Sequence, residues 1–319
     1  MTQDVVLSVK NLKVEFPQEN GDVLKAVRDV SFDLRRGETL GIVGESGCGK
    51  STLAKTIMRL NKAKSGEVLI DGKDFLKLKP RELWHARRQI QMIFQDPFSS
   101  LDPRQTVGSA VMEPMKVYKL YRKRSEYEAR AKKLFDMVGL SSLHMNRFPH
   151  EFSGGQLQRV GIARALALKP SILVADEPVS SLDVSIQAQV SNLLKDLQQE
   201  LNLSILFIAH DLSVVRYMSH EIAVMYLGKM VELQQTEKLC QEPKHPYTRL
   251  LLSSMLHVSP KVVQKPFEVD FSELPSATNI PSGCHFHPRC QYAKGSCSEE
   301  TPNSVALKTG FVQCHHPVQ

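Results

Sequence analysis

The sequence lacks any apolar run of about 18 residues, the length that a membrane-spanning helix needs. Its first residues, MTQDVVLSVK, lack the charged region followed by an apolar region that marks a secretory signal. We therefore expect the chain to stay in the cytoplasm. Internal repeats and low-complexity tracts are also missing, which argues against a repeat architecture.

The charge is only mildly unbalanced, with 41 basic and 34 acidic residues and a formal net charge of +7. This excess would suit a polyanion or an anionic membrane surface, but charge alone favours a plain solvated basic surface. Apolar residues make up 42% and charged residues 24%, ordinary values that exclude disorder and collagen. The length of 319 residues predicts one large domain with an appendage. Six cysteines in a cytosolic chain are no disulfide framework.

Strand patterns alternate with helix patterns along most of the chain. The apolar segment 39–43 is predicted as a buried strand that leads through a glycine-rich loop into a helix over 50–60. Apolar strands at 172–175 and 204–209 alternate with further helices, as in parallel βαβ units. The segment from about 96 to 149 breaks this pattern and is interpreted as a mostly helical insertion. We expect an α/β fold with helices on both faces of the sheet.

The glycine-rich loop fits the phosphate-binding P-loop pattern G-x-x-x-x-G-K-S in the required context of strand, loop and helix. Its backbone N–H groups and the following helix start favour a bound triphosphate, whereas a chance glycine turn is the bland alternative. We expect Lys50 to reach the β- and γ-phosphates, Ser51 to ligate Mg²⁺ and Thr52 to contact the α-phosphate. The expected ATP-binding residues are Gly44, Glu45, Ser46, Gly47, Cys48, Gly49, Lys50, Ser51 and Thr52.

Two acids end the strand at 172–175, which places Asp176 and Glu177 at the carboxyl edge of the sheet, where α/β folds bind ligands. This is the Walker B arrangement. Asp176 can hold the Mg²⁺ shell, and Glu177 can orient the attacking water or accept its proton. Acids at a strand end can instead cap a helix or lie in a solvated turn, but the P-loop favours the catalytic interpretation.

The segment Phe152-Ser153-Gly154-Gly155-Gln156 resembles the signature sequence of ATP-binding-cassette (ABC) ATPases, with phenylalanine in place of the usual leucine. A serine and free N–H groups at a helix start form an anion site, although a simple helix cap has the same pattern. The resemblance implies that ATP is bound between two subunits, each signature facing the other subunit's γ-phosphate. It covers residues 5 to 255.

Further landmarks of the ABC family follow in order. The resemblance implies that Gln95 senses Mg²⁺ and the attacking water, that Asp183 belongs to the D-loop, and that His210 contacts the γ-phosphate. Catalysis is therefore assigned to Glu177, His210, Lys50 and Gln95. Phe16 is placed like the aromatic residue that stacks on adenine, with a core position as the rival interpretation.

Three later segments resemble the ATPase subunits of bacterial dipeptide and oligopeptide importers, namely residues 95–103, 245–248 and 281–290. Cys284, Cys290, Cys297 and Cys314 offer four soft ligands, which suit zinc or an iron–sulfur cluster. The importer subunits that the chain resembles carry a [4Fe–4S] cluster here, so a cluster is expected ahead of zinc or unligated thiols. In the bland interpretation, the metal only staples a tail that has little core of its own.

The fold expected from this resemblance is a P-loop ABC ATPase with an antiparallel β subdomain, a helical subdomain at about 96–165 and a cysteine-rich extension. The nucleotide-binding domain is assigned to 1–255 and the extension to 256–319. Implied partners are a homologous ATPase subunit, two membrane permease subunits and, indirectly, a solute-binding protein, at the cytoplasmic face of the membrane. No nucleic acid is expected. A soluble ABC protein of DNA repair or translation is the rival, and an exporter ATPase is a third reading.

Overall fold

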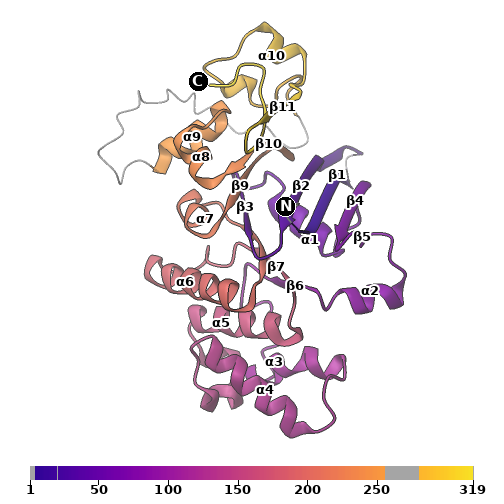
Figure 1. Cartoon of the computed structure of the whole chain (residues 1–319), viewed down its shortest axis with the longest axis vertical. Coiled ribbons are helices and arrows are strands. Elements are labelled where there is room, and N and C mark those ends of the chain that lie inside the picture. Colours follow the sequence, from indigo (N-terminus) through magenta and orange to yellow (C-terminus); the bar gives the residue numbers. More distant parts are fainter. Residues whose placement is uncertain (1–3, 20, 256–279, 319) are drawn as a thin grey trace. The chain divides into compact units, whose positions relative to one another are not determined.

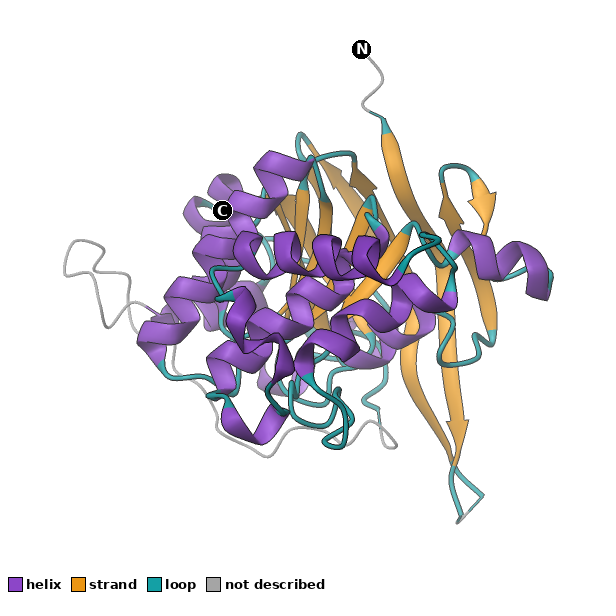
Figure 2. Ribbon diagram, turned by 90° about the horizontal axis from the view of Figure 1, so that it is seen from below, coloured by secondary structure: helices purple, strands orange, loops and turns teal. Residues whose placement is uncertain are grey.

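The computed structural model describes residues 4–19, 21–255 and 280–318. These residues form two compact units. The helical unit contains residues 4–6, 35–38 and 77–206, and the P-loop unit contains 7–34, 39–76 and the described residues from 207 to 318. Figure 1 labels the elements along the chain, and Figure 2 distinguishes helices in purple from strands in orange. No helix in the described ranges has the length and hydropathy that crossing a membrane requires.

The helical unit places several helices around a pair of parallel strands. Its elements are α2 (Pro80–Ala86), β6 (Ile90–Ile93), α3 (Val107–Val117), α4 (Arg124–Met137), η1 (Ser142–Asn146), η2 (Pro149–Glu151), α5 (Gly154–Ala165), η3 (Leu166–Leu168), β7 (Ile172–Asp176) and α6 (Val184–Leu201). β6 and β7 pair in parallel, with Ile93 opposite Ala175. α3 packs against both α4 and α5. The carboxyl ends of β6 and β7 therefore lie at one edge.

The P-loop unit is richer in strands. Its elements are β1 (Val5–Pro17), β2 (Val23–Arg35), β3 (Thr39–Val43), α1 (Lys50–Ile57), β4 (Ser65–Ile70), β5 (Lys73–Asp74), α7 (Leu212–Met218), β9 (Glu221–Tyr226), β10 (Lys229–Gln235), α8 (Thr236–Gln241), α9 (Pro246–Met255), η5 (His287–Arg289), α10 (Gly295–Glu299), β11 (Ser304–Leu307) and β12 (Gly310–Gln313). One sheet has the order β2-β1-β4-β5, and β1 and β4 pair antiparallel. A second run of strands has the order β3-β9-β10-β12-β11.

β8 (Ser204–Ile208) begins in one unit and ends in the other. Its first residue, Ser204, donates from its backbone N–H to the carbonyl of Ser171, 3.0 Å away in the helical unit. Just after it, the Ala209 N–H donates to the carbonyl of Ile42 in β3, 3.2 Å away in the P-loop unit. β3, β7 and β8 are buried along their whole length, as expected for parallel strands covered on both faces.

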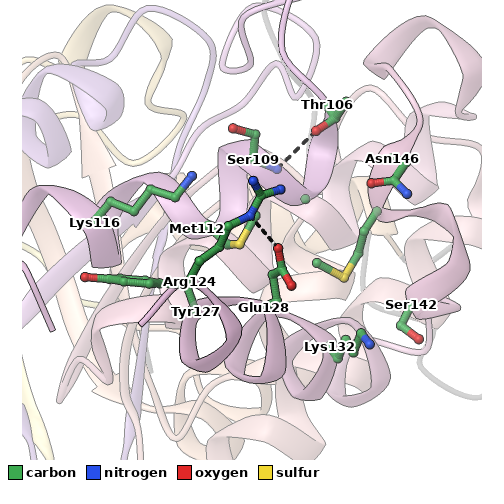
Figure 3. A pocket seen from close by; sticks show the side chains of 12 residues that line it. Thr106, Ser109, Met112, Lys116, Arg124, Tyr127, Glu128, Lys132, Ser142 and Asn146 are labelled. Atoms are coloured by element: carbon green, nitrogen blue, oxygen red, sulfur yellow. Dashed lines mark hydrogen bonds and ion pairs between the residues drawn. The ribbon is translucent and has the colours of Figure 1, made fainter. Parts of the chain in front are cut away.

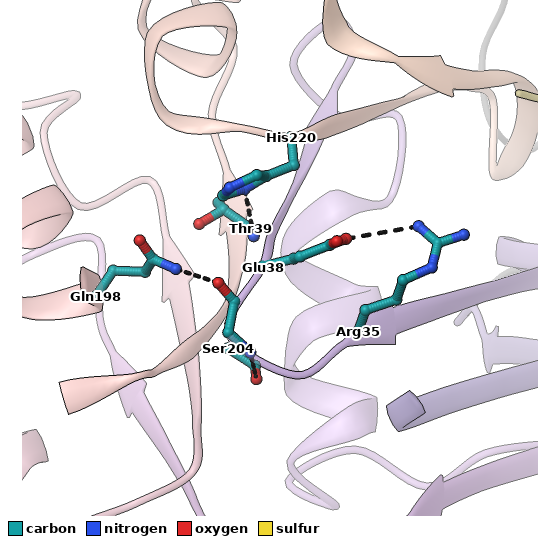
Figure 4. Close-up of polar contacts among 7 residues, drawn as sticks. Arg35, Glu38, Thr39, Gln198, Ser204 and His220 are labelled. Atoms are coloured by element: carbon teal, nitrogen blue, oxygen red, sulfur yellow. Dashed lines mark hydrogen bonds and ion pairs between the residues drawn. The ribbon is translucent and has the colours of Figure 1, made fainter. Parts of the chain in front are cut away.

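A polar turn within the helical unit fixes where β2 ends (Figure 4). Gly37 has a φ of 69°, a conformation that glycine adopts without strain. Its N–H donates to the Ser204 hydroxyl at 3.0 Å, and its carbonyl accepts from the Gln198 side chain. Arg35 and Glu38 form an ion pair of 3.5 Å across the same turn. These contacts hold the turn that follows β2.

The structure corrects two expectations about elements. The helix expected over 50–60 ends at Ile57, because the chain turns at Arg59, whose φ is 54°. The tail was expected to lie outside the core, but β12 pairs antiparallel with β10, and Phe286 and Val312 are buried. β11 and β12 are four residues long each, too short to show a periodicity in the sequence. The rest of the extension, 256–279, lies outside the described residues.

Candidate functional site

The P-loop lies between β3 and α1, as predicted, and close backbone contacts require its glycines. A Cβ at Gly44 would lie 2.1 Å from the carbonyl oxygen of Met225. A Cβ at Gly49, the N-cap of α1 with a φ of 104°, would lie 2.1 Å from the carbonyl oxygen of Ala26. The loop between them leaves Ser46 and Gly47 exposed. Glycine thus lets the backbone curl tightly, which presents N–H groups to an anion.

Lys50 folds back across this loop. Its side chain is buried, and Nζ donates to the carbonyl oxygens of Gly44 at 2.7 Å and Glu45 at 3.0 Å. Cys48 Sγ lies 3.9 Å from the same Nζ. Burial raises the pKa of the Cys48 thiol, so it stays neutral at physiological pH. Ser51 and Thr52 are half-buried in the first turn of α1, so the lysine and the hydroxyls expected to contact phosphate and Mg²⁺ lie together.

The Walker B acids end β7 in the helical unit, and Gln95 follows β6 beside it. The side-chain amide of Gln95 donates to Glu177 Oε2 at 3.1 Å, which brings two predicted catalytic residues together. Asp176 is buried, whereas Glu177 is half-buried. Glu177 has a φ of 47°, a conformation that costs free energy for a residue with a Cβ and that is concentrated at functional sites.

The signature segment begins α5 with reciprocal hydrogen bonds. The Ser153 hydroxyl accepts from the Gln156 N–H at 3.3 Å, and the Gln156 side chain accepts from the Ser153 N–H at 3.0 Å. Ser153 stays exposed, and a Cβ at Gly155 would lie 2.4 Å from Ile186 Cγ2 on α6. Phe152, the departure from leucine, is buried and so keeps the apolar character of that position. Asp183 is exposed at the N-cap of α6.

His210 and Phe16 belong to the P-loop unit. His210 is exposed one residue beyond Ala209, which hydrogen-bonds to Ile42 of β3. Because β3 leads directly into the P-loop, His210 lies at the same edge of the sheet as that loop. Phe16 is half-buried near the end of β1, and its stacking on adenine stays a prediction.

The four clustered cysteines meet at one cavity of the P-loop unit, which His287, His315 and His316 also line. Burial raises the pKa of the Cys290 and Cys314 thiols to about 11, whereas metal ligation requires the thiolate. Within the described ranges, no group of three or more His, Cys, Asp or Glu side chains is arranged to hold a metal ion. The thiols therefore do not form a completed metal centre in this structure. The buried Nε2 of His316 has no hydrogen-bond partner among the described residues.

A groove in the helical unit offers a second cavity, of about 810 Å³, between α3, α4 and η1 (Figure 3). The sulfur-containing side chains of Met112 and Met145 line it. Charged side chains stand around them, including Lys116 and the Arg124–Glu128 ion pair of 2.8 Å. Flexible methionines suit a surface that adapts to a partner. No sequence motif singled out this groove.

Two residues far along the chain contact the P-loop and were not assigned to the site from the sequence. The hydroxyl of Tyr247 accepts from the Glu45 N–H at 2.9 Å. The guanidinium of Arg289 donates to both oxygens of the Glu45 carboxylate at 3.0 Å. Both residues lie in segments, 245–248 and 281–290, that the sequence analysis used only as evidence for the resemblance to importer ATPases.

The chain is similar to known proteins along its whole length. It matches the ABC transporter family over residues 27–180 and the family "Oligopeptide/dipeptide transporter, C-terminal region" over 231–297. It is 50% identical to the oligopeptide transport ATP-binding protein AppF of Bacillus subtilis, with 98% of each chain covered. It is 49% identical to the oligopeptide transport ATP-binding protein OppF of Escherichia coli, covering 93% of this chain and 92% of that one.

A solved structure also resembles the chain. It is a dimeric ATP-binding cassette in a post-hydrolysis state bound to ADP and phosphate. The match has a TM-score of 0.65 and 32% identity, and it covers 72% of this chain and 98% of that chain. The P-loop ABC ATPase fold and ATP hydrolysis coupled to transport are therefore shown. Because the similarity at half identity runs from end to end, the chain belongs to the family of ABC-transporter ATP-binding subunits that carry the oligopeptide/dipeptide transporter C-terminal region.

Proposed function

We propose that this ATPase drives the uptake of dipeptides or oligopeptides at the cytoplasmic face of a bacterial cytoplasmic membrane. The relatives named for oligopeptide transport support this substrate class, as does the matching C-terminal region. The solute itself is bound by other subunits, so a related small solute is the alternative. The single observation that carries the ATPase chemistry is the hydrogen bond from Gln95 to Glu177, beside the buried Asp176.

In the proposed mechanism the chain mainly positions ATP and neutralises its charge. Lys50 binds the β- and γ-phosphates. Ser51 and Asp176 would hold Mg²⁺, which would offset charge on the phosphates. Gln95 and Glu177 orient the water, Glu177 accepts its proton, and His210 donates a hydrogen bond to the γ-phosphate. Water attacks the γ-phosphorus, the bond to the bridging oxygen breaks, and ADP leaves with that oxygen.

The proposed working form is a dimer in which two ATP molecules lie between two chains. Ser153 and the exposed start of α5 supply hydrogen-bond donors to the γ-phosphate held by the other chain. The dimeric cassette found among the solved structures supports this arrangement. The second chain is a homologous, non-identical ATPase subunit. ATP binding closes the dimer, and hydrolysis allows it to open.

The groove lined by Met112 and Met145 is the proposed docking site for a segment of a membrane permease subunit. Family membership requires such a partner, and a groove of about 810 Å³ with an adaptable floor and a charged rim fits a short helix. Met112→Glu should abolish co-purification of the permease subunits from membranes without lowering the ATPase activity of the isolated chain. Lys133→Glu is the matched control, because Lys133 lies exposed on α4 outside the groove.

The proposed function is tested by a pull-down of the tagged chain from membranes. We expect two polytopic membrane proteins and a second ATPase subunit to be retained. Recovery of ribosomes or nucleic acid without membrane subunits would instead support the soluble rival. The variant Met112→Glu distinguishes a wrong docking site from a wrong function. If Met112→Glu still retains the membrane subunits, the docking site is wrong but the proposed function stands.

We also propose that Cys284, Cys290, Cys297 and Cys314 together hold a [4Fe–4S] cluster, with zinc as the lesser alternative. Four thiols around one cavity are the donor set of such clusters, and a cluster would staple the extension where its own core is small. Anaerobic purification with iron, sulfide and zinc analysis tests this proposal. About four iron atoms per chain with an absorption band near 400 nm are expected, whereas stoichiometric zinc or no metal would contradict the cluster.

A further inference from the structure

A partly buried ion pair connects the C-terminal extension to the P-loop. The two terminal nitrogens of Arg289 each donate to a different oxygen of Glu45, both at 3.0 Å. The Arg289 side chain is 9% exposed and that of Glu45 is 23% exposed. Planar two-point pairs of this kind hold both partners in one orientation more firmly than a single exposed ion pair does. Arg289 is the last residue of η5, which lies between Cys284 and Cys290.

Glu45 is held at all three of its polar groups. Its N–H donates to the Tyr247 hydroxyl at 2.9 Å, and its carbonyl accepts from Lys50 Nζ at 3.0 Å. Tyr247 is fully buried against Tyr226 and Phe286, with ring centroids 4.6 and 5.4 Å away. The residue that anchors Arg289 is therefore also the residue on which the phosphate-binding lysine rests.

Glu45 brings a negative charge into a loop that must bind a polyanion. An unpaired carboxylate at this position would repel the phosphates and would also compete for Lys50. We propose that Arg289 is a positioning residue for ATP binding, which neutralises Glu45 and fixes its place in the P-loop. The inference rests on the nucleotide site described above, and it does not require any group bound by the cysteines.

A second contact between the extension and the rest of the P-loop unit provides a control. The Arg28 guanidinium lies 2.9 Å from His285 Nε2, and His285 is buried beside Cys284. This contact ties the same extension down but does not involve the P-loop. Arg28→Ala should therefore loosen the extension to a similar degree without changing the charge beside the phosphates.

The test measures the dissociation constant for MgATP of the full chain by titration with a fluorescent ATP analogue. Arg289→Ala should weaken binding about tenfold, equivalent to about 1.4 kcal/mol. Glu45→Gln in the same chain should restore most of the affinity, because the double variant no longer carries an unpaired carboxylate. Arg289→Lys should lose less than Arg289→Ala, and Arg28→Ala should bind ATP as the unchanged chain does.

Steady-state kinetics provide a readout that a merely structural role would not move. Arg289→Ala should raise KM for ATP and leave kcat near its original value, since Arg289 pairs with Glu45 and not with Gln95 or Glu177. The inference would be overturned if Arg289→Ala bound MgATP as tightly as the unchanged chain, or if the double variant bound MgATP as weakly as Arg289→Ala. Either result would leave the nucleotide site itself intact. Normal ATP binding by Lys50→Ala would contradict the nucleotide site itself and the inference with it.

Discussion

His245 is a buried histidine that stays neutral. Its side chain is 1% exposed at the start of α9, and burial lowers its pKa to about 3. Its Nδ1 accepts from the Tyr247 N–H at 3.0 Å, and its ring lies 5.8 Å from that of Phe286. The side chain therefore helps to place Tyr247, and through it Glu45 of the P-loop.

The lowered pKa of His245 predicts a loss of stability in acid. Its folded-state pKa of about 3 lies below the usual 6.5, so below pH 6.5 the unfolded chain binds a proton that the folded chain does not. The stability is complete above pH 6.5 and falls by about 1.4 kcal/mol per pH unit as the pH drops below it. His245→Asn retains an acceptor for the Tyr247 N–H but does not titrate, so it should lose less stability between pH 7 and 5.

Urea unfolding at several pH values measures this effect, with pH 8 giving the baseline cost of the substitution. His285 has a similarly lowered pKa of about 3, so part of the acid sensitivity should remain in His245→Asn. Equal losses of unfolding free energy in both proteins between pH 7 and 5 would show that His245 is not the group responsible.

The sequence predicted individual residues well where they belong to local motifs. Lys50 and the P-loop glycines fall within a few residues of one another, and the structure places them around one tight loop. The pairing of Arg289 with Glu45 joins residues 244 positions apart and leaves no local pattern. The approach of Gln95 to Glu177 was implied only by the resemblance, since no strand was predicted at β6.

Helix α5 depends on close packing at its first turn. A Cβ at Gly155 would collide with Ile186 Cγ2 at 2.4 Å, and a β-branched methyl cannot swing away easily. For Gly161, in the same helix, no neighbouring atom of the described residues lies within 4 Å of the position that a Cβ would take. Packing against α6 therefore requires a glycine at position 155, whereas position 161 has room for a side chain.

Alanine substitutions at these two glycines should have opposite effects on stability. Gly155→Ala should lower the free energy of unfolding by about 1–3 kcal/mol through overpacking against α6. Gly161→Ala should raise it by about 0.5–1 kcal/mol, because alanine loses less backbone entropy in a helix. Thermal or urea unfolding measures both, and destabilisation of similar size in the two variants would contradict the packing explanation.

Elements with long, regular patterns were predictable, and short ones were not. The strands predicted over 39–43, 172–175 and 204–209 agree with β3, β7 and β8 to within a residue, because a continuous apolar run is a strong signal of a buried strand. β11 and β12 join the sheet through backbone hydrogen bonds with β10 rather than through an apolar pattern of their own. Tertiary pairing therefore decides their structure.

For the whole molecule, the central claim is that ATP is bound between two chains and hydrolysed by Glu177. The resemblance to ABC ATPases predicted this family, and the comparisons confirm the family. The dimer and the identity of the second chain stay proposals, because both depend on contacts with another chain. The cluster stays a proposal because the described residues include no group arranged to hold a metal ion. The strained φ of 47° at Glu177 and its hydrogen bond from Gln95 support its catalytic role.

The most direct measurement compares the unchanged chain with Glu177→Gln, with Glu200→Gln as the control because Glu200 is exposed on α6. Light scattering in MgATP reports association, and phosphate release reports turnover. Glu177→Gln should bind ATP and accumulate as a closed dimer while turnover falls about a hundredfold or more. Turnover by Glu177→Gln at the rate of the unchanged chain would contradict the catalytic assignment. The two-chain site would be contradicted if Glu177→Gln bound ATP but did not associate, either with itself or with the homologous subunit.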